Sequence, residues 1–392
     1  MFILEIAKSQ ELCTSQLDRD RATAHGTGRC TGQDDALSGG RLRWARGAVA
    51  VQWLGEKNND FFFYAVGLHY LCKKIKKMKS SLVSILIPAY NAAPFLERSV
   101  ASALGQSYAD IEVVIVDDGS TDETPTIADG MAARDSRIKV VHQENRGPAE
   151  ARRTALNSAT GEYIAYLDAD DELMPDAIGF LYGKCAEHGL DLAFGSMIKV
   201  TSDAEFEILH PMEGVLTGDE FLSFLFDRRC MCAQGEYLCR RELLREDFFP
   251  PHGELFPNED VLMYICLSAH VHLVGFYRKP VTRYNYVPTS LSSTNRLSSL
   301  DNWERFFTLV EENLQGRGKL ESLQKELLCM KLDRLAFYVY PLDKSKPWVS
   351  QAIHDHRFKL PRRYDILQRL LHYPKLCHWC VVNNRRIKQL FK

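Results

Sequence analysis

Acidic and hydroxyl side chains cluster in three short loops of this chain, and each loop follows an apolar run. The loops are Pro88-Ala89-Tyr90-Asn91, Asp117-Asp118-Gly119-Ser120-Thr121-Asp122 and Asp168-Ala169-Asp170-Asp171. Crowded carboxylates repel one another unless a cation neutralises them, and their hard oxygens suit Mg²⁺ or Mn²⁺. A metal held by few carboxylates keeps open positions for phosphate oxygens. Taken singly, each loop also fits a structural role, since Asp-Gly favours turns and the residues after it can cap a helix.

A further acidic pair, Glu259 and Asp260, stands where an apolar helical pattern begins. After this pair, apolar and small residues repeat at helical spacing: Leu262, Ile265, Cys266 and Ala269. A carboxylate in such a place can act as a general base toward a hydroxyl group. The structural alternative is that Asn258 caps the helix and the two acids only favour its dipole.

The elements that must position these loops alternate between strand and helix from Ser80 onward. The apolar patterns predict strands at 82–87, 112–117, 138–142, 163–167 and 191–200, and helices at 95–106, 122–133, 148–159 and 175–188. This alternation predicts an α/β fold with a mostly parallel sheet and flanking helices. Ligands of such sheets bind at the carboxyl ends of the strands, which is where the three loops would meet.

Three ordered segments give the chain a specific resemblance. VSILIPAYN, VIVDDGSTDET and NRGPAEARRTALNSATGEYIAYLDADD resemble the motifs of a family 2 glycosyltransferase with the GT-A fold. The motifs lie within residues 82–200, and weaker similarity extends to about Asn295. The resemblance implies transfer of a sugar from a nucleoside-diphosphate donor, with UDP-sugar expected, to a hydroxyl of a glycan or lipid-linked acceptor in polysaccharide biosynthesis. It also implies inversion and a Mn²⁺ or Mg²⁺ cofactor.

The resemblance assigns roles to individual positions. Pro88, Ala89 and Tyr90 would line the nucleotide pocket, Asp118 would bond the uracil, and Asp117 would support its loop. Arg152 would lie near the diphosphate or the sugar, although an exposed helix arginine is an equal alternative.

The remaining roles fall on the Asp-x-Asp motif and on the later acidic pair. Asp170 would bind the metal, and Asp168 would contact the ribose or the metal shell. Asp260 would be the catalytic base, with Glu259 as its orienting or acceptor-binding neighbour.

The chain divides by composition into four regions. Residues 1–77 read as a poorly structured, dispensable extension, and segment 20–48 shows no strand or helix periodicity. Residues 78–200 would bind the nucleotide sugar, 201–298 would supply the acceptor side and the base, and 299–392 would be helical with a basic tail. Within the third region, 240–246 reads as an amphipathic helix.

Composition narrows the function classes further. With 49 Lys and Arg against 51 Asp and Glu, the net charge of −2 excludes bulk electrostatic binding of nucleic acid. The 11 cysteines are irregularly spaced, which favours reduced thiols and a cytoplasmic setting. The basic amphipathic tail after His372 can lie on an anionic membrane at the inner face, or pack against the catalytic region with its charges in water.

Two rival functions stay open at this stage. The first is a non-catalytic scaffold that binds nucleotide sugars, against which the retained Asp118, Asp168, Asp170 and Asp260 argue. The second is a nucleotidyltransferase of related architecture. Its usual Gly-rich phosphate loop is missing after the first strand, where the chain reads PAYNAAPFLE.

Overall fold

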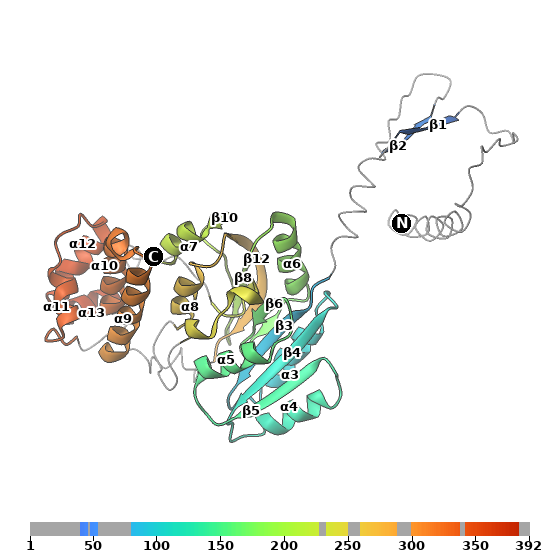
Figure 1. Ribbon diagram of the computed structural model, residues 1–392. Helices are drawn as coiled ribbons and strands as arrows, with labels where there is room; N and C mark the ends of the chain where they lie inside the picture. Colours follow the sequence, from blue (N-terminus) through green and yellow to red (C-terminus); the bar gives the residue numbers. More distant parts are fainter. Residues whose placement is uncertain are drawn as a thin grey trace, which may run out of the picture. The chain divides into compact units, whose positions relative to one another are not determined.

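The computed structural model describes residues 40–45, 48–53, 80–226, 233–249, 259–287, 299–337 and 342–383. The chain divides into two compact units, Met1–Met78 and Lys79–Lys392 (Figure 1). In the first unit, β1 (Gly40–Ala45) pairs antiparallel with β2 (Ala48–Trp53). The strand β1 lies in the segment 20–48, where the sequence shows no periodicity. Each of the two strands is only six residues long.

The second unit is built on a ten-stranded sheet that runs β10-β12-β8-β11-β6-β3-β4-β5, with β7 paired to β12 and β9 to β8. Its parallel part consists of β3 (Val83–Ala89), β4 (Ile111–Asp118), β5 (Ile138–Gln143) and β6 (Tyr163–Tyr166). These are four of the five predicted strands, and the fifth is β8 (Leu192–Val200). Buried β-branched and aliphatic residues fill β3 and β4, as expected for strands covered on both faces.

The other part of the sheet is mixed. The short strand β11 (Tyr237–Arg240) lies antiparallel between β6 and β8, and β12 (Leu273–Asn285) runs parallel to β8. The strands β7 (Glu172–Leu173), β9 (Glu205–Ile208) and β10 (Gly214–Thr217) complete the sheet with antiparallel pairs. The predicted regions 78–200 and 201–298 therefore share one sheet.

The helix predicted at 240–246 is wrong. Arg240 ends β11, and only the short 3-10 turns Arg241–Leu243 and Glu246–Phe248 follow. The reason lies in burial, because Tyr237, Leu238 and Cys239 are buried in the sheet before the charged run begins.

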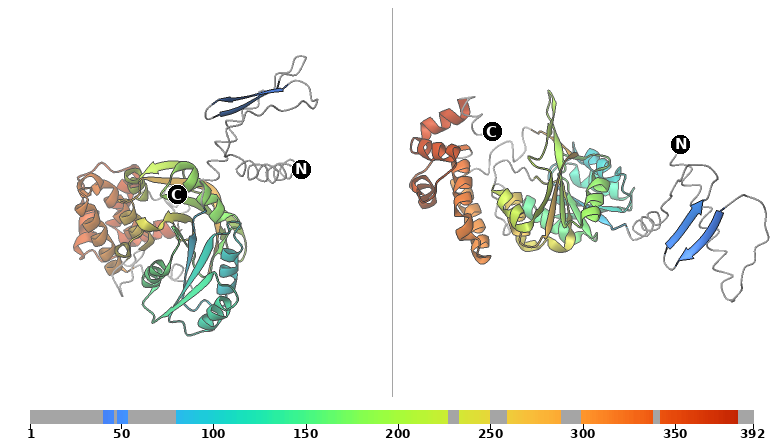
Figure 2. Two further views of the ribbon diagram at one scale, coloured as in Figure 1. Left: turned by 45° about the vertical axis from the view of Figure 1, so that its right-hand side comes forward. Right: turned by 90° about the horizontal axis from the view of Figure 1, so that it is seen from above.

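Helices cover both faces of the sheet (Figure 2). One face carries α5 (Pro148–Ser158), α7 (Gly218–Leu225) and α8 (Glu259–Leu267), whose apolar residues join one core cluster. The other face carries α3 (Leu96–Leu104), α4 (Thr124–Ala132) and α6 (Ala177–His188) in a second cluster. The sheet thus forms the middle layer of a three-layer α/β fold.

The C-terminal region is helical, as predicted. It contains α9 (Leu300–Gly316), α10 (Leu320–Phe337), α11 (Pro347–His354), α12 (Arg362–Leu371) and α13 (Pro374–Asn383). Its apolar residues belong to the same core cluster as α5, α7 and α8. After α9, Arg317 Nη1 donates to the Ile265 carbonyl and to Ser268 Oγ, at 3.0 Å each. None of the helices in the described residues is both long and apolar enough to cross a membrane.

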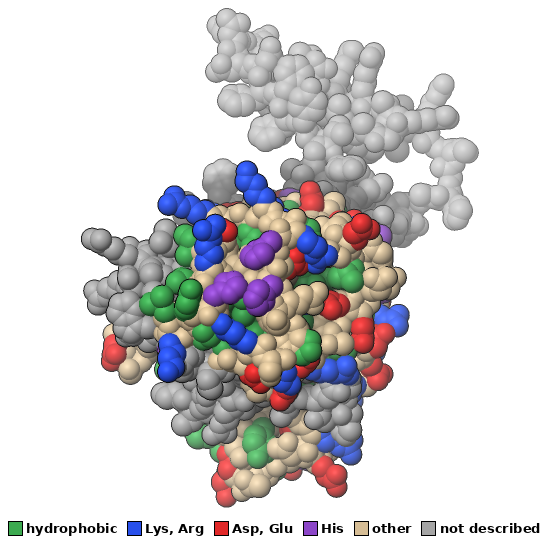
Figure 3. All heavy atoms as spheres, turned by 90° about the vertical axis from the view of Figure 1, so that its left-hand side faces the viewer, with side chains coloured by type: hydrophobic (Ala, Val, Ile, Leu, Met, Phe, Trp, Pro, Cys, Tyr) green, Lys and Arg blue, Asp and Glu red, His purple; other side chains and the backbone are tan. Residues whose placement is uncertain are grey.

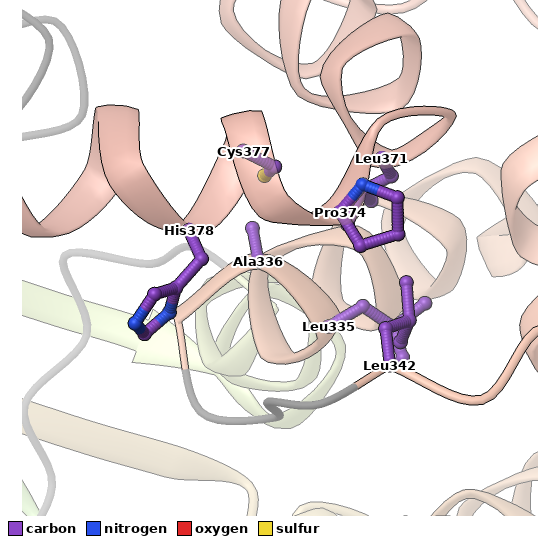
Figure 4. Close-up of a pocket in the computed structure, with 7 residues that line it drawn as sticks. All are labelled: Leu335, Ala336, Leu342, Leu371, Pro374, Cys377 and His378. Carbon is purple, nitrogen blue, oxygen red and sulfur yellow. The ribbon is translucent and has the colours of Figure 1, made fainter.

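A small hollow lies between α10, α12 and α13 (Figure 4). Apolar side chains line most of it, among them Leu335, Leu342 and Leu371, and its cavity volume is about 10 Å³. This is about the space that a single water molecule needs, which is roughly 10–15 Å³. The hollow is therefore too small for a nucleotide sugar, and the chemistry must be sought at the sheet edge.

Candidate active site

The first two loops are joined by hydrogen bonds at the carboxyl ends of β3 and β4. The Asn91 amide donates to Ser120 Oγ (2.9 Å), and the Thr121 amide donates to Asn91 Oδ1 (2.8 Å). Asn91 adopts a left-handed conformation with φ +49°, which asparagine tolerates better than most residues. Ala89 is buried beside this junction, Pro88 is partly buried, and Tyr90 keeps 52% of its surface exposed. The residues expected to line a nucleotide pocket thus stand at the edge that the sequence predicts.

The third loop is held to the same edge from two directions. From α3, Ser99 Oγ donates to the Asp168 carbonyl (3.3 Å) and Arg98 Nη2 donates to the Asp170 carbonyl (3.1 Å). From the end of β12, the Asn285 amide donates to Asp171 Oδ1 (2.8 Å). The end of β12 therefore helps to fix the position of the Asp-x-Asp loop.

Asp118 is buried and almost saturated with protein donors. Its Oδ1 accepts from Gln143 Nε2 (2.7 Å) and the Arg146 amide (2.9 Å), and its Oδ2 accepts from the Gly147 amide (2.8 Å). A carboxylate offers about four acceptor positions, so one stays available for a ligand donor. Gly147 holds φ +91°, a conformation that favours glycine and aims its amide at Asp118.

Asp117 supports the second loop from below. Its Oδ1 accepts from the Ser120 amide (3.0 Å), and His142 Nδ1 lies 3.0 Å from its Oδ2. The other ring nitrogen of His142 lies 3.1 Å from Asp129 Oδ1, and hydrogen bonds to Asp117 and Asp129 raise the pKa of His142. Between these partners Gly119 adopts φ +69°, and a Cβ there would meet the Asn145 nitrogen at 2.6 Å. The loop conformation therefore requires glycine.

Carboxylates in the third loop crowd one another. Burial and then Asp168 raise the pKa of Asp170 to about 6, and burial with both neighbours raises the pKa of Asp171 to about 9. Asp171 is buried, whereas the Asp168 side chain is 37% exposed. Among the described residues, no group of three or more His, Cys, Asp or Glu side chains is arranged to hold a metal ion. The loop instead fits a cation held by one or two carboxylates and completed by phosphate oxygens.

Arg152, on α5, bridges the two predicted halves of the site. Its Nη2 donates to Asp168 Oδ1 (3.3 Å), and its Nη1 donates to Glu259 Oε1 at the start of α8. The Arg152 side chain is only 11% exposed, so it is not the exposed helix arginine of the alternative reading. Burial alone would lower the pKa of Arg152, but Glu259, Asp168 and Asp260 raise it. This arginine therefore ties the Asp-x-Asp loop to the acidic pair, whose Glu259 lies 107 positions after Arg152 in the chain.

The carboxylates of the acidic pair, Glu259 and Asp260, are largely shielded from water. Asp260 Oδ1 accepts from the Val261 amide (2.8 Å), and burial raises the pKa of Asp260 and of Glu259. The helix begins at Glu259 as expected, while Asn258, its proposed cap, lies outside the described residues. Among the described residues, Glu259 Oε2 and Arg152 Nε are buried and have no hydrogen-bond partner, so each retains unused hydrogen-bonding capacity.

Sequence reasoning missed the segment before β11. Glu236 is buried and electrostatically coupled to Asp260, and burial raises the pKa of Glu236 well above its ordinary value. Beside it, Gln234 Nε2 is buried and has no hydrogen-bond partner in the part of the chain that the structure describes. The segment reads AQGEY, which belongs to none of the three motif segments. The one feature of its sequence that could have drawn attention to this segment is Gly235, which adopts φ +84° in a turn.

Residues 84–248 match the family model described as glycosyl transferase family 2. The chain carries a family 2 glycosyltransferase domain. Two curated relatives come from Bacillus subtilis strain 168. The uncharacterized glycosyltransferase EpsJ is 36% identical over 167 residues, 41% of this chain and 48% of EpsJ. The protein named as glycosyltransferase EpsH is 29% identical over 259 residues, 64% of this chain and 74% of EpsH. The chain thus spans about half of EpsJ and three quarters of EpsH.

A solved structure extends the likeness of this glycosyltransferase domain to the fold. The crystal structure of S. aureus TarS 1-349, in complex with UDP-GlcNAc, superimposes with a TM-score of 0.52 at 19% identity. The alignment covers 79% of this chain and 91% of the TarS chain. At this identity the likeness shows the fold alone, which is the GT-A arrangement that the motifs predict.

Proposed function

We propose that this chain transfers a sugar from a nucleoside-diphosphate donor, with UDP-sugar as the first candidate, to a hydroxyl group of a glycan or lipid-linked acceptor. The observation that carries the proposal is the Arg152 bridge between Asp168 and Glu259. It brings the motif expected to bind the donor next to the pair expected to activate the acceptor. A protein that only binds nucleotide sugars has no need of the second group.

On the donor side, the loops after β3 and β4 would hold the nucleoside. Tyr90 is exposed at their junction, and Asp118 keeps one acceptor position for a base N–H. Asp117 keeps the second loop in shape through the Ser120 amide. The UDP-GlcNAc complex of TarS, a protein with the same fold, is consistent with a uridine donor.

At the diphosphate, Asp170 and Asp168 would hold Mn²⁺ or Mg²⁺, which when bound supplies positive charge to the leaving group. Burial and then repulsion from Asp168 raise the pKa of Asp170 to about 6, and a bound cation would relieve this repulsion. Arg152 adds a fixed cation beside Asp168, and its unpartnered Nε offers one more donor.

At the acceptor, Asp260 would take the proton of the attacking hydroxyl. The acceptor oxygen would bond to the anomeric carbon as the bond from that carbon to the diphosphate breaks, which inverts the configuration. Burial raises the pKa of Asp260, and a raised pKa makes a carboxylate a stronger base. Glu259, held by Arg152, would orient the acceptor through its unpartnered Oε2.

The decisive experiment is a calorimetric titration of UDP into the full chain, with and without Mn²⁺, beside GDP and dTDP. Metal-dependent binding of one nucleotide supports the donor site and limits the sugar search to conjugates of that nucleotide. Transfer is then tested with those conjugates. Folded protein that binds no nucleotide would contradict the proposal, and binding without turnover on any acceptor would favour the scaffold alternative.

The acceptor and the site of action belong to the same proposal. A cytoplasmic enzyme with lipid-linked acceptors would work at the inner face of a membrane. The predicted contact of the basic tail depends on Lys375, on α13, and on Arg385, Arg386, Lys388 and Lys392, which lie outside the described residues. Flotation with anionic vesicles tests this contact.

A further inference from the structure

The outer face of the helical region differs in charge from the rest of the molecule. Residues 342–378 contain eight Lys and Arg but only three Asp and no Glu, in a chain whose net charge is −2. In Figure 3, histidine side chains gather near the middle of this face, with Lys and Arg around them and hydrophobic side chains beside them. None of these residues belongs to the proposed active site.

Three histidines form the centre of this surface. The rings of His354 and His372 meet edge to face with centroids 5.0 Å apart, and His356 follows two positions after His354. The Lys344 ammonium donates to the His372 carbonyl. Burial, then His354, Lys344 and His356, lower the pKa of His372. We call His354, His356, His372, Lys344 and Tyr373 the histidine face.

The carboxylates packed nearby are already engaged by their own neighbours. Asp355, between two of the histidines, accepts from Arg357 Nε (2.9 Å) and Nη2 (2.7 Å). In the loop before α11, Asp343 accepts from the Ser345 amide and hydroxyl. On α12, Asp365 pairs with Arg369, and on α9, Asp301 and Glu304 pair with Lys346. Protonation of the histidines would therefore add positive charge to a surface whose acids are committed elsewhere.

Apolar side chains stand exposed beside these cations. Tyr373 exposes 68% of its surface and Leu376 exposes 49%, with Lys375 between them. Tyrosine and leucine among lysines suit a boundary between water and hydrocarbon, because the rings and alkyl groups enter while the charges stay at the phosphates. A nucleic acid would use the cations but leave the leucine in water.

We infer that the histidine face docks on an anionic phospholipid surface, and that docking tightens as the pH falls through the range in which histidine titrates. The negative surface attracts each cation with about 1 kcal/mol, or about fivefold in affinity. Histidine is the side chain whose charge ordinarily changes between pH 5 and 8, and the lowered pKa of His372 moves its charge change toward the acid end of that range, whereas Lys and Arg stay charged throughout. The part of the binding affinity that changes with pH thus measures the contribution of the histidines. The part that stays constant measures the contribution of the lysines and arginines.

The test is co-sedimentation of the full chain with phosphatidylglycerol-phosphatidylcholine vesicles at pH 7.5 and pH 5.5, with pure phosphatidylcholine as the neutral surface. We expect at least about tenfold tighter binding at pH 5.5, from two or more added charges. The variant His354→Gln/His356→Gln/His372→Gln should lose this gain. The matched control His188→Gln/His270→Gln/His272→Gln removes three exposed histidines of the catalytic region and should keep it.

Each further arm distinguishes another source of binding. Arg385→Ser/Arg386→Ser/Lys388→Ser should weaken binding equally at both pH values, because the tail keeps its charge. Tyr373→Ser should weaken binding to vesicles but not to polyuridine RNA. The inference is overturned by equal affinity at the two pH values, by an unchanged pH ratio in the histidine variant, or by competition from millimolar inorganic phosphate or RNA. Thermal melts establish that each variant is folded.

Discussion

The two sides of the candidate site satisfy their polar groups in different ways. On the donor side, Asp117 and Asp118 are buried and each oxygen has a protein partner. On the proposed transfer side, Arg152 Nε, Glu259 Oε2 and Gln234 Nε2 are buried and have no partner among the described residues. An unpaired buried polar atom costs about 1–3 kcal/mol, so the proposed transfer side is the less stable half of the site. We therefore expect the proposed donor side to be built in advance and the proposed transfer side to be completed by what binds there.

The strongest test of this difference is Asp260→Asn. Loss of the base should reduce kcat by about 10²–10⁴ while UDP affinity stays within twofold, because the donor loops do not depend on Asp260. Single-turnover transfer and calorimetry measure the two quantities. Asp247→Asn, an exposed aspartate paired with Arg245, is the matched control. Near-normal turnover of Asp260→Asn would contradict the assignment of Asp260 as the base.

Arg152→Gln should affect both sides at once. The change leaves Glu259 without its buried cation and frees Asp168, and breaking such a pair costs about 3–5 kcal/mol. We expect a lower melting temperature, and partial recovery when Glu259→Gln is added. Arg153→Gln, the next residue on α5, controls for the loss of a helix arginine. A stable Arg152→Gln protein, with no coupling in the double-mutant cycle, would show that the bridge is unimportant.

The pH profile should also separate the two sides. Burial raises the pKa of Asp260, so its ionised fraction falls as the pH drops through a value above the ordinary aspartate range. The acid limb of kcat/KM should therefore lie above the ordinary pKa of about 3.9, and Mg²⁺-dependent UDP affinity, which needs ionised Asp170, should be followed separately over the same pH range. Since Arg152 lowers the pKa of Asp260, Arg152→Lys should keep the limb near its place and Arg152→Gln should move it upward. An acid limb at the ordinary aspartate pKa would contradict the buried base.

The smallest effect is expected from Gly119→Ala in the donor loop. The left-handed conformation at φ +69° costs an alanine about 1–2 kcal/mol, and the Cβ would press on the Asn145 backbone. UDP affinity should fall several-fold while kcat at saturating donor changes little. Gly130→Ala on α4, where a Cβ has room, should leave the affinity unchanged and slightly stabilise the helix. A reduced kcat with normal UDP affinity would reverse the roles assigned to the two sides.

Features of the fold that depend on neighbouring residues in the chain can be predicted from the sequence, whereas features that depend on contacts between distant residues cannot. The parallel strands and their terminal loops follow from local apolar runs, and β3, β4, β5 and β6 begin within one residue of their predicted positions. The partners of Arg152 could not be derived, because Glu259 lies 107 positions away and no local pattern records that pairing. Likewise β11 is only four residues long, and its neighbours in the sheet decide its conformation.

The position of β11 also has a consequence for how the chain matures on the ribosome. Strands β6 and β8 leave the exit tunnel first, yet the strand between them arrives about 40 residues after β8. Until then each exposes an edge with unpaired amides and carbonyls, to which another nascent chain could add a strand. Asp260, the proposed base, follows later still, so the loops of the proposed donor side emerge before it. Synthesis therefore passes through an interval in which protection by a chaperone matters more than catalysis.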